Sequence, residues 1–292
     1  MLIDNSSSHH VSHSDLTQQH LFDEKINCLP FLRWAGGKRW LKPTFDQYLP
    51  KNGFNAYHEP FIGGGSIMLH LSPKTAYISD LNSELINAYR AVKSDLNLLT
   101  TYLKEFKHTE KDYYKIRAKK FDDNTQEAAR FIYLNYASFN GIYRVNKNGE
   151  YNVPYGKRGD NFLYDYENLN NVSKALANVN MSSGDFYDSL DNVRKGDLVF
   201  LDPPYTITHT LNTFIQYNKK IFSLEEQVRL SEMITKIKEK DAYYILTNAA
   251  HPLIRKIFDH GDSVFEVSRG SKIGGKNAKR GQFSEYIFTN GV

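Results

Sequence analysis

One carboxylate and one aromatic ring follow a short apolar run late in the chain. Residues 197–201 are bounded by Gly196 and two prolines, a pattern that predicts a buried strand of a parallel sheet. The run Asp-Pro-Pro-Tyr follows at residues 202–205. A residue that precedes proline is pushed out of the helical region, so the chain stays extended beyond the strand. Open α/β sheets bind ligands at that edge, where a carboxylate, free carbonyls and a ring suit a planar amine.

A second set of residues suits an adenosine cofactor. Residues 56–61 predict a strand, 62–65 a glycine loop, 66–71 the start of a helix, and 75–79 a second strand that ends at Asp80. In dinucleotide-type folds an acid at that position accepts hydrogen bonds from ribose hydroxyls. The loop is not a full G-x-G-x-x-G and its spacing to the acid is short. These two departures disfavour NAD as the cofactor. Another adenosine cofactor stays open, and so does a structural role in which the glycines only allow close packing of the helix.

A glycine pair and a lysine form the third set. Gly36, Gly37 and Lys38 follow the largely apolar residues 31–35 and precede a predicted helix that runs to Tyr48. Glycines let backbone amides approach an anion, and the lysine supplies a point charge.

Composition bounds the class of protein. The chain has 292 residues, a formal charge of +4 and one cysteine, Cys28, which excludes an internal disulfide framework. No apolar run reaches the roughly 20 residues that span a bilayer, and the pattern of a signal peptide is missing. We therefore expect a cytoplasmic protein with no membrane contact. The histidines of residues 1–28 lack fixed ligand spacing, so we expect a disordered tail and no metal site.

Several motifs resemble one family in their order along the chain. They are Trp-Ala-Gly-Gly-Lys at 34–38, Glu-Pro-Phe-Ile-Gly-Gly-Gly-Ser at 59–66, Asp-Leu-Asn-Ser-Glu-Leu at 80–85 and Asp-Pro-Pro-Tyr at 202–205. Residues 139–144, 152–156 and 284–290 are also similar to it. The chain resembles the Dam-like DNA adenine-N6 methyltransferases over nearly everything after residue 29.

This resemblance implies S-adenosylmethionine as cofactor and a set of residues that bind it. Lys38 would lie near the methionine carboxylate, Asp80 would hold the ribose, and Phe186 would form an apolar wall against the adenine. The full set implied is Trp34, Lys38, Phe61, Gly63, Gly65, Asp80, Asp185, Phe186 and Asp202.

The resemblance also implies the chemistry of the Asp-Pro-Pro-Tyr motif. The target adenine must leave the DNA helix, because its amine is buried by pairing and stacking. Asp202 and the Pro203 carbonyl would accept its two N6 hydrogens, and Tyr205 would stack on the flipped base. No residue is singled out by the sequence as the final proton acceptor.

For residues 86–180 we expect a unit that recognises the DNA target. The pattern favours helices over 86–93, 96–106, 113–121 and 126–136, then a hairpin within 139–159 that carries turn signals and cations. Arginine is the side chain best shaped to bind guanine, and the resemblance places Arg144 at the first guanine and Pro154 at a base. The sequence after Gly156 departs from the family's pattern. The expected DNA contacts are Asn140, Arg144, Pro154, Lys157, Arg158, Arg269 and Lys272.

These observations predict a Rossmann-like α/β methyltransferase sheet, from residues 29–85 and 181–292, with the mostly helical recognition unit inserted between them. Further strands are expected at 242–247, 263–267 and 286–289, and helices at 224–239 and 251–260. The expected partner is double-stranded DNA, with no obligate protein partner, and the expected target is adenine in GATC. The alternatives are GATATC, cytosine N4, an RNA adenine, a protein glutamine, or a DNA-binding protein with a relic cofactor fold.

Overall fold

The computed structural model describes residues 26–157, 164–205, 222–270 and 282–292. Most of the expected N-terminal tail lies outside these ranges, as do Arg158 and Lys272.

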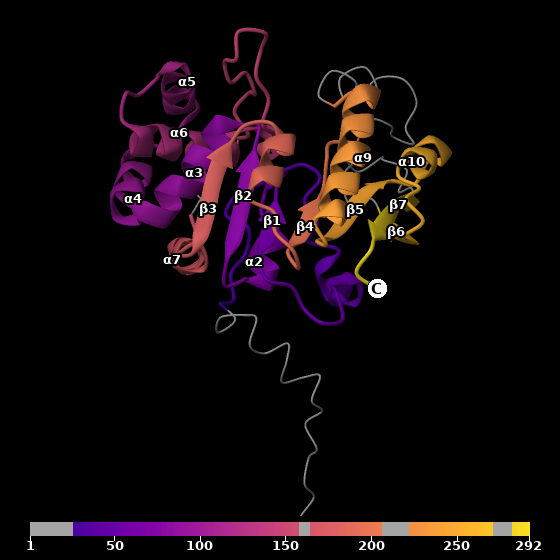
Figure 1. The fold of residues 1–292 in the computed structure, drawn as a ribbon. Helices are drawn as coiled ribbons and strands as arrows, with labels where there is room; N and C mark the ends of the chain where they lie inside the picture. The colour runs from indigo at the N-terminus through magenta and orange to yellow at the C-terminus, as the bar shows by residue number, and fades with distance from the viewer. Residues whose placement is uncertain (1–25, 158–163, 206–221, 271–281) are drawn as a thin grey trace, which may run out of the picture.

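A seven-stranded sheet in the order β3-β2-β1-β4-β5-β7-β6 forms the centre of the fold (Figure 1). The strands β3, β2, β1, β4 and β5 pair in parallel, and β7 runs antiparallel to both β5 and β6. The predicted Rossmann-like α/β sheet is therefore confirmed. Its strands are β1 (Tyr57–Glu59), β2 (Ala76–Asp80), β3 (Val179–Ser183), β4 (Leu198–Leu201), β5 (Tyr243–Ala249), β6 (Ser263–Gly270) and β7 (Gln282–Thr289).

The order of the strands reverses direction between β1 and β4. The chain leaves β1 toward β2 on one side, and β4 pairs with the other side of β1. In open α/β sheets such a switch point opens a crevice at the carboxyl ends of the strands, where ligands bind. All four residues of β4 are buried, as expected for a central parallel strand that is covered on both faces.

Helices cover the two faces of the sheet and gather beyond β3 (Figure 1). Helix α3 packs against α6 and α7, while α9 packs on β5. The helical elements are η1 (Lys42–Tyr48), α2 (Met68–Leu71), α3 (Ser83–Ser94), α4 (Leu96–Glu105), α5 (Glu110–Ala118), α6 (Asn124–Ala137), η2 (Phe139–Gly141), α7 (Tyr166–Ala175), η4 (Phe186–Asp191), α9 (Leu224–Glu239) and α10 (Pro252–Ile257).

Three helical elements differ from the sequence prediction, and local capping explains the first of them. Helix α5 begins at Glu110 rather than at residue 113, because the Thr109 hydroxyl accepts a hydrogen bond from the Asp112 amide at 3.1 Å. The segment expected as a helix before Tyr48 is a 3₁₀-helix, and α7 was not predicted.

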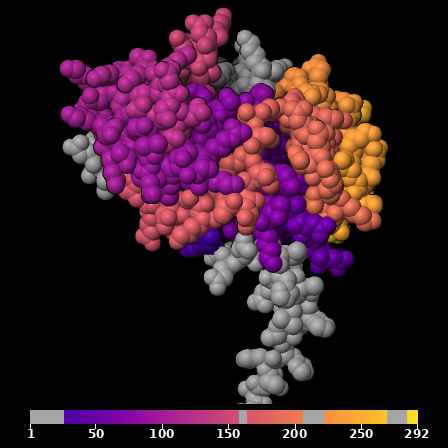
Figure 2. Space-filling view, turned by 60° about the vertical axis from the view of Figure 1, so that its left-hand side comes forward, coloured from indigo at the N-terminus to yellow at the C-terminus, as the bar shows by residue number. Residues whose placement is uncertain are grey.

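Two clusters of buried side chains form the core. The larger includes side chains of α3, α4, α6 and α7 and of the strands β1 and β2. The smaller lies under α9 and α10, on the side of β5 and β7. In the space-filling view, the magenta helices form a lobe beside the orange and yellow part of the molecule (Figure 2).

Within the described ranges, no helix is both long enough and apolar enough to cross a membrane. The same ranges hold no cluster of three His, Cys, Asp or Glu side chains suited to a metal ion.

Candidate active site

Asp202 lies directly after β4, at the switch point of the sheet. Its Oδ1 atom accepts a hydrogen bond from the Thr247 hydroxyl of β5 at 2.7 Å. The same oxygen lies 2.7 Å from the Lys38 ammonium. Both bonds end on one carboxylate oxygen, so they fix the position of that oxygen.

Lys38 lies at the centre of this cluster and is only 4% exposed. Besides its ion pair with Asp202, the ammonium donates to the Gly36 carbonyl at 3.1 Å. It also lies 4.9 Å from the centre of the Tyr205 ring, within the range of a cation–π contact. The structure thus brings Lys38, Asp202 and Tyr205 together, with Lys38 bonded to the carboxylate of Asp202.

Burial and charge act in opposite directions on Asp202. Removal from water raises the pKa of its carboxyl group, and the ammonium of Lys38 and the hydroxyl of Thr247 lower it. The nearby Glu285 carboxylate raises the pKa again. The net direction is upward, so the ion pair compensates burial only in part.

The glycine loop after β1 packs against the end of β2. The Gly63 amide donates to Asp80 Oδ2 at 3.1 Å, and the Asn82 amide donates to Asp80 Oδ1 at 3.0 Å. Gly63 has φ of +44°, and a Cβ placed there would lie 2.7 Å from Trp34 Cδ1. A side chain at this position is therefore excluded by both backbone conformation and space. Trp34, the loop and Asp80 form one packed unit.

Two aromatic contacts border this unit. Trp34 stacks on Tyr143, with ring centres 5.6 Å apart, and so joins the glycine loop to residues of the predicted hairpin. On the other side Phe61 stacks on Phe186 at 5.2 Å. Phe186 is buried, and the neighbouring Asp185 forms an ion pair with Arg229 of α9 at 3.0 Å.

Sequence reasoning missed four polar side chains of this site. Thr247 and Glu285 contact Asp202 or its neighbours from β5 and β7, and Arg229 holds Asp185. The fourth, Glu59, is buried and accepts a hydrogen bond from the Tyr57 hydroxyl at 2.7 Å. A sequence signal existed for two of them, because Glu59 and Glu285 both lie in segments that resemble the methyltransferase family, at 59–66 and 284–290.

Burial raises the pKa of Glu59 to about 8. The hydrogen bond from Tyr57 lowers this pKa, and the charges of Asp202 and Asp80 raise it further. Glu59 therefore holds a proton in the neutral range, unlike an ordinary surface glutamate.

Four of the predicted DNA-reading residues lie on or beside a short hairpin that projects from the top of the molecule in Figure 1. Its strands meet through an isolated bridge between Val145 and Tyr151, and the Asn152 amide donates to the Arg144 carbonyl at 3.1 Å. Arg144 is exposed, and its Nε donates to the Asn152 side chain at 2.7 Å. The other predicted contacts on this segment, Asn140, Pro154 and Lys157, are also exposed.

Arg269 is part of β6, but its side chain is outside the description, as are Arg158 and Lys272 altogether.

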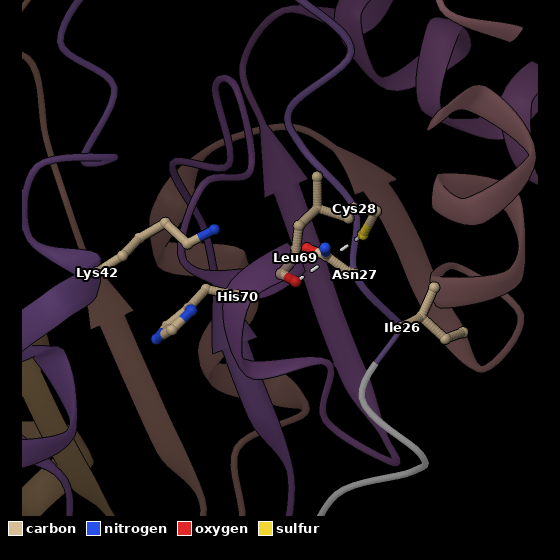
Figure 3. A pocket seen from close by; sticks show the side chains of 6 residues that line it. All are labelled: Ile26, Asn27, Cys28, Lys42, Leu69 and His70. Atoms are coloured by element: carbon tan, nitrogen blue, oxygen red, sulfur yellow. Dashed lines mark hydrogen bonds between the residues drawn. The ribbon is translucent and has the colours of Figure 1, made fainter. Parts of the chain in front are cut away.

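A small cavity of about 190 Å³ lies apart from this cluster (Figure 3). It is lined by Ile26, Asn27, Cys28, Lys42, Leu69 and His70. The Cys28 thiol is buried, points to the Leu69 carbonyl at 3.9 Å, and has a pKa raised by that burial. A raised pKa keeps the thiol protonated and unreactive, so we assign the cavity no chemistry.

Comparison with known proteins identifies the family of the chain. The sequence profile of the D12 class N6 adenine-specific DNA methyltransferases matches residues 34–273, which includes every element around Asp202 except β7. The chain belongs to this family. It is therefore an adenine-specific DNA methyltransferase, as the motifs predicted.

Individual relatives of this methyltransferase agree. The Type II methyltransferase M1.LlaDCHI of Lactococcus lactis subsp. cremoris is 37% identical over 280 residues, which cover 91% of this chain and 96% of the relative. The Type II methyltransferase M.MjaIII of Methanocaldococcus jannaschii is 36% identical, over 75% of this chain and 84% of its own length. The DNA adenine methylase of Escherichia coli K12 is 30% identical, over 86% and 91%.

Proposed function

We propose that this methyltransferase transfers a methyl group from S-adenosylmethionine to the N6 amine of an adenine flipped out of double-stranded DNA, within GATC. The observation that carries the proposal is the cluster of Lys38, Asp202 and Tyr205 at the carboxyl end of β4. That strand pairs with β1, whose end leads into the glycine loop that packs on Asp80.

The residues beside the glycine loop fit S-adenosylmethionine. Asp80 offers carboxylate oxygens that each accept one backbone amide, which leaves lone pairs for ribose hydroxyls. Phe61 is half-buried and offers an apolar ring to an adenine, while the buried Phe186 stacks on Phe61 and supports it. Arg229 holds the Asp185 next to Phe186 in place. Bound there, the cofactor supplies an electrophilic methyl group on a sulfonium.

The side chains at β4 would position the amine. One Asp202 oxygen is held by Lys38 and Thr247, which leaves the other oxygen to accept an N6 hydrogen while the Pro203 carbonyl accepts the second. Tyr205 would stack on the extruded base, and its ring is kept in place by the Lys38 ammonium beneath it. Fixed geometry of this kind accounts for much of the rate of an enzyme.

The helices of residues 86–180 and their hairpin would read the DNA. Arg144 is exposed on the hairpin, and its Nε and Nη2 donate to Asn152, which would orient the guanidinium for contact with the first guanine. Pro154 would contact a base, and the exposed lysines of α5 would contact phosphates. We expect this activity in the cytoplasm and with no obligate protein partner.

The names of the relatives bear on the genetic context of this enzyme and not on its target sequence. Some relatives carry the name DNA adenine methylase and others Type II methyltransferase, so both a solitary enzyme and one paired with a restriction nuclease have precedent.

Expression in a host that lacks adenine methylation tests the target. Genomic DNA should then resist the nuclease that methylated GATC blocks, at GATC sites both inside and outside GATATC. Purified enzyme should also transfer a tritiated methyl group to a GATC duplex and not to a GTAC duplex of equal length. GATC sites that stay cleavable outside GATATC would overturn the assignment.

A further inference from the structure

Glu285 is a buried acid on the sheet strand that closes the site. It lies on β7, between Ala249 of β5 and Val267 of β6, and is only 2% exposed. A charged group at such a position costs free energy unless it is paired. The partners of the Glu285 carboxylate therefore decide whether it can stay charged.

Its contacts lead to the two residues that flank Asp202. The Tyr205 hydroxyl donates to Glu285 Oε2 at 2.6 Å, and the Lys38 ammonium lies 3.8 Å from the same oxygen. One ammonium thus serves two carboxylates, with Asp202 the nearer at 2.7 Å. The far edge of the Tyr205 ring is tied to β7, while its face lies over Lys38.

We propose that Glu285 is a positioning residue for methyl transfer, which holds the Tyr205 ring over Lys38 and the Lys38 ammonium against Asp202. This inference rests on the roles proposed above for Asp202 and Tyr205. A tyrosine that is bonded at its hydroxyl and covered on one face by a cation has little freedom to rotate. The ring can therefore present its other face to a flipped base without a further loss of side-chain entropy.

The charge of Glu285 has a second effect that can be measured. Asp202 must be ionised to accept the amine hydrogens, and it faces Lys38, Tyr205, Glu285, Glu59 and Tyr57. The carboxylate of Glu285 raises the pKa of Asp202. Its removal should lower that pKa, so the acid limb of the activity profile should move to lower pH.

Four variants test the role: Glu285→Ala, Glu285→Gln, Tyr205→Phe, and the exposed Glu266→Gln on β6 as control. Glu285→Ala should lower kcat at least about tenfold, a change of about 1.4 kcal/mol in the barrier. KM for the cofactor should change less than about threefold, because the glycine loop and Asp80, which would hold the ribose, follow β1 and end β2, away from β7. Glu285→Gln should recover part of kcat, since its amide oxygen still accepts from Tyr205, and should show the shifted acid limb.

Tyr205→Phe separates positioning from general stability. It deletes only the hydroxyl that Glu285 holds, so its loss in kcat should not add to that of Glu285→Ala in the double variant. Additive losses, or a Glu285→Ala enzyme as fast as Glu266→Gln, would overturn the inference. So would a Glu285→Gln profile that keeps the wild-type acid limb.

Failure of this inference differs from failure of the proposed function. All rates are measured on whichever adenine-containing duplex the wild type methylates, so the identity of the target does not enter. An active Asp202→Ala enzyme would refute the proposed chemistry. An inactive Asp202→Ala beside a fully active Glu285→Ala would refute only the role of Glu285.

Discussion

At the scale of single residues, the site contains two carboxylates that share one ammonium group. Lys38 is bonded to Asp202 and close to Glu285, and all three side chains are largely withdrawn from water. Loss of one partner of such a group leaves the others buried and uncompensated. Substitutions here therefore combine chemical and electrostatic effects, and each needs a binding measurement beside the rate.

Asp202→Ala should nearly abolish turnover and leave the affinity for S-adenosylmethionine within a few-fold of the wild type. The reason is that Asp202 would act on the target amine, while Asp80 and the glycine loop would hold most of the cofactor. Single-turnover rates on a duplex and calorimetric titration of the cofactor measure both quantities. Asp202→Asn is the matched variant, since it keeps the shape and removes the charge. A fully active Asp202→Ala enzyme would contradict the mechanism.

Asp80→Ala should show the opposite pattern. It removes charge-assisted hydrogen bonds to the ribose worth roughly 1.5–3 kcal/mol, a loss of about tenfold to 150-fold in affinity. The substitution also removes the hydrogen bond that the Gly63 amide donates to Asp80. Calorimetry should therefore show a raised dissociation constant for the cofactor, and saturating cofactor should restore much of the rate. Equal affinity in wild type and variant would rule out this placement of the ribose.

At the scale of elements, the hydrophobic pattern and the turn-forming residues between apolar runs predicted most of the sheet. β4 and β5 were predictable because continuous apolar runs are typical of central parallel strands. Helix α5 was displaced because the cap at Thr109 starts it early, and α7 was missed. The ammonium–carboxylate pair of Lys38 and Asp202 has no local signal, because only the strand order brings these distant residues together.

The hairpin that carries Arg144 should control sequence discrimination. Arg144→Ala should cost roughly 1–3 kcal/mol with the cognate duplex and relax discrimination at the first guanine, rather than weaken all DNA equally. The exposed Lys147→Ala at the tip of the same hairpin serves as control and should change affinity alike for cognate and substituted duplexes. Competition binding with duplexes altered only at the first base pair measures the difference. An equal loss on both duplexes would assign Arg144 to the phosphate backbone instead.

At the scale of the whole molecule, the carboxyl edge of the sheet concentrates acids. Glu59, Asp80, Asp202 and Glu285 all lie at the ends of neighbouring strands or on the strand that closes them. Burial raises the pKa of Glu59, Asp80 and Asp202. An edge with excess negative charge complements the positive sulfonium of the proposed methyl donor. It also makes the stability of the empty enzyme depend on pH.

Glu59 should contribute measurably to that dependence. Its pKa is raised from 4.5 to about 8 by burial in the folded protein, whereas the unfolded chain releases the proton near the ordinary value. The stabilisation is therefore fully present below pH 4.5 and is lost as the pH rises through 8, with an upper bound on the order of 4–5 kcal/mol. Glu59→Gln carries no titratable proton, so its free energy of unfolding should fall less between pH 5 and pH 8.5 than that of the wild type. Denaturant titrations of both proteins at these two values, with Glu266→Gln as the exposed control, measure this. Parallel losses in wild type and Glu59→Gln would show that Glu59 is already ionised in the folded enzyme.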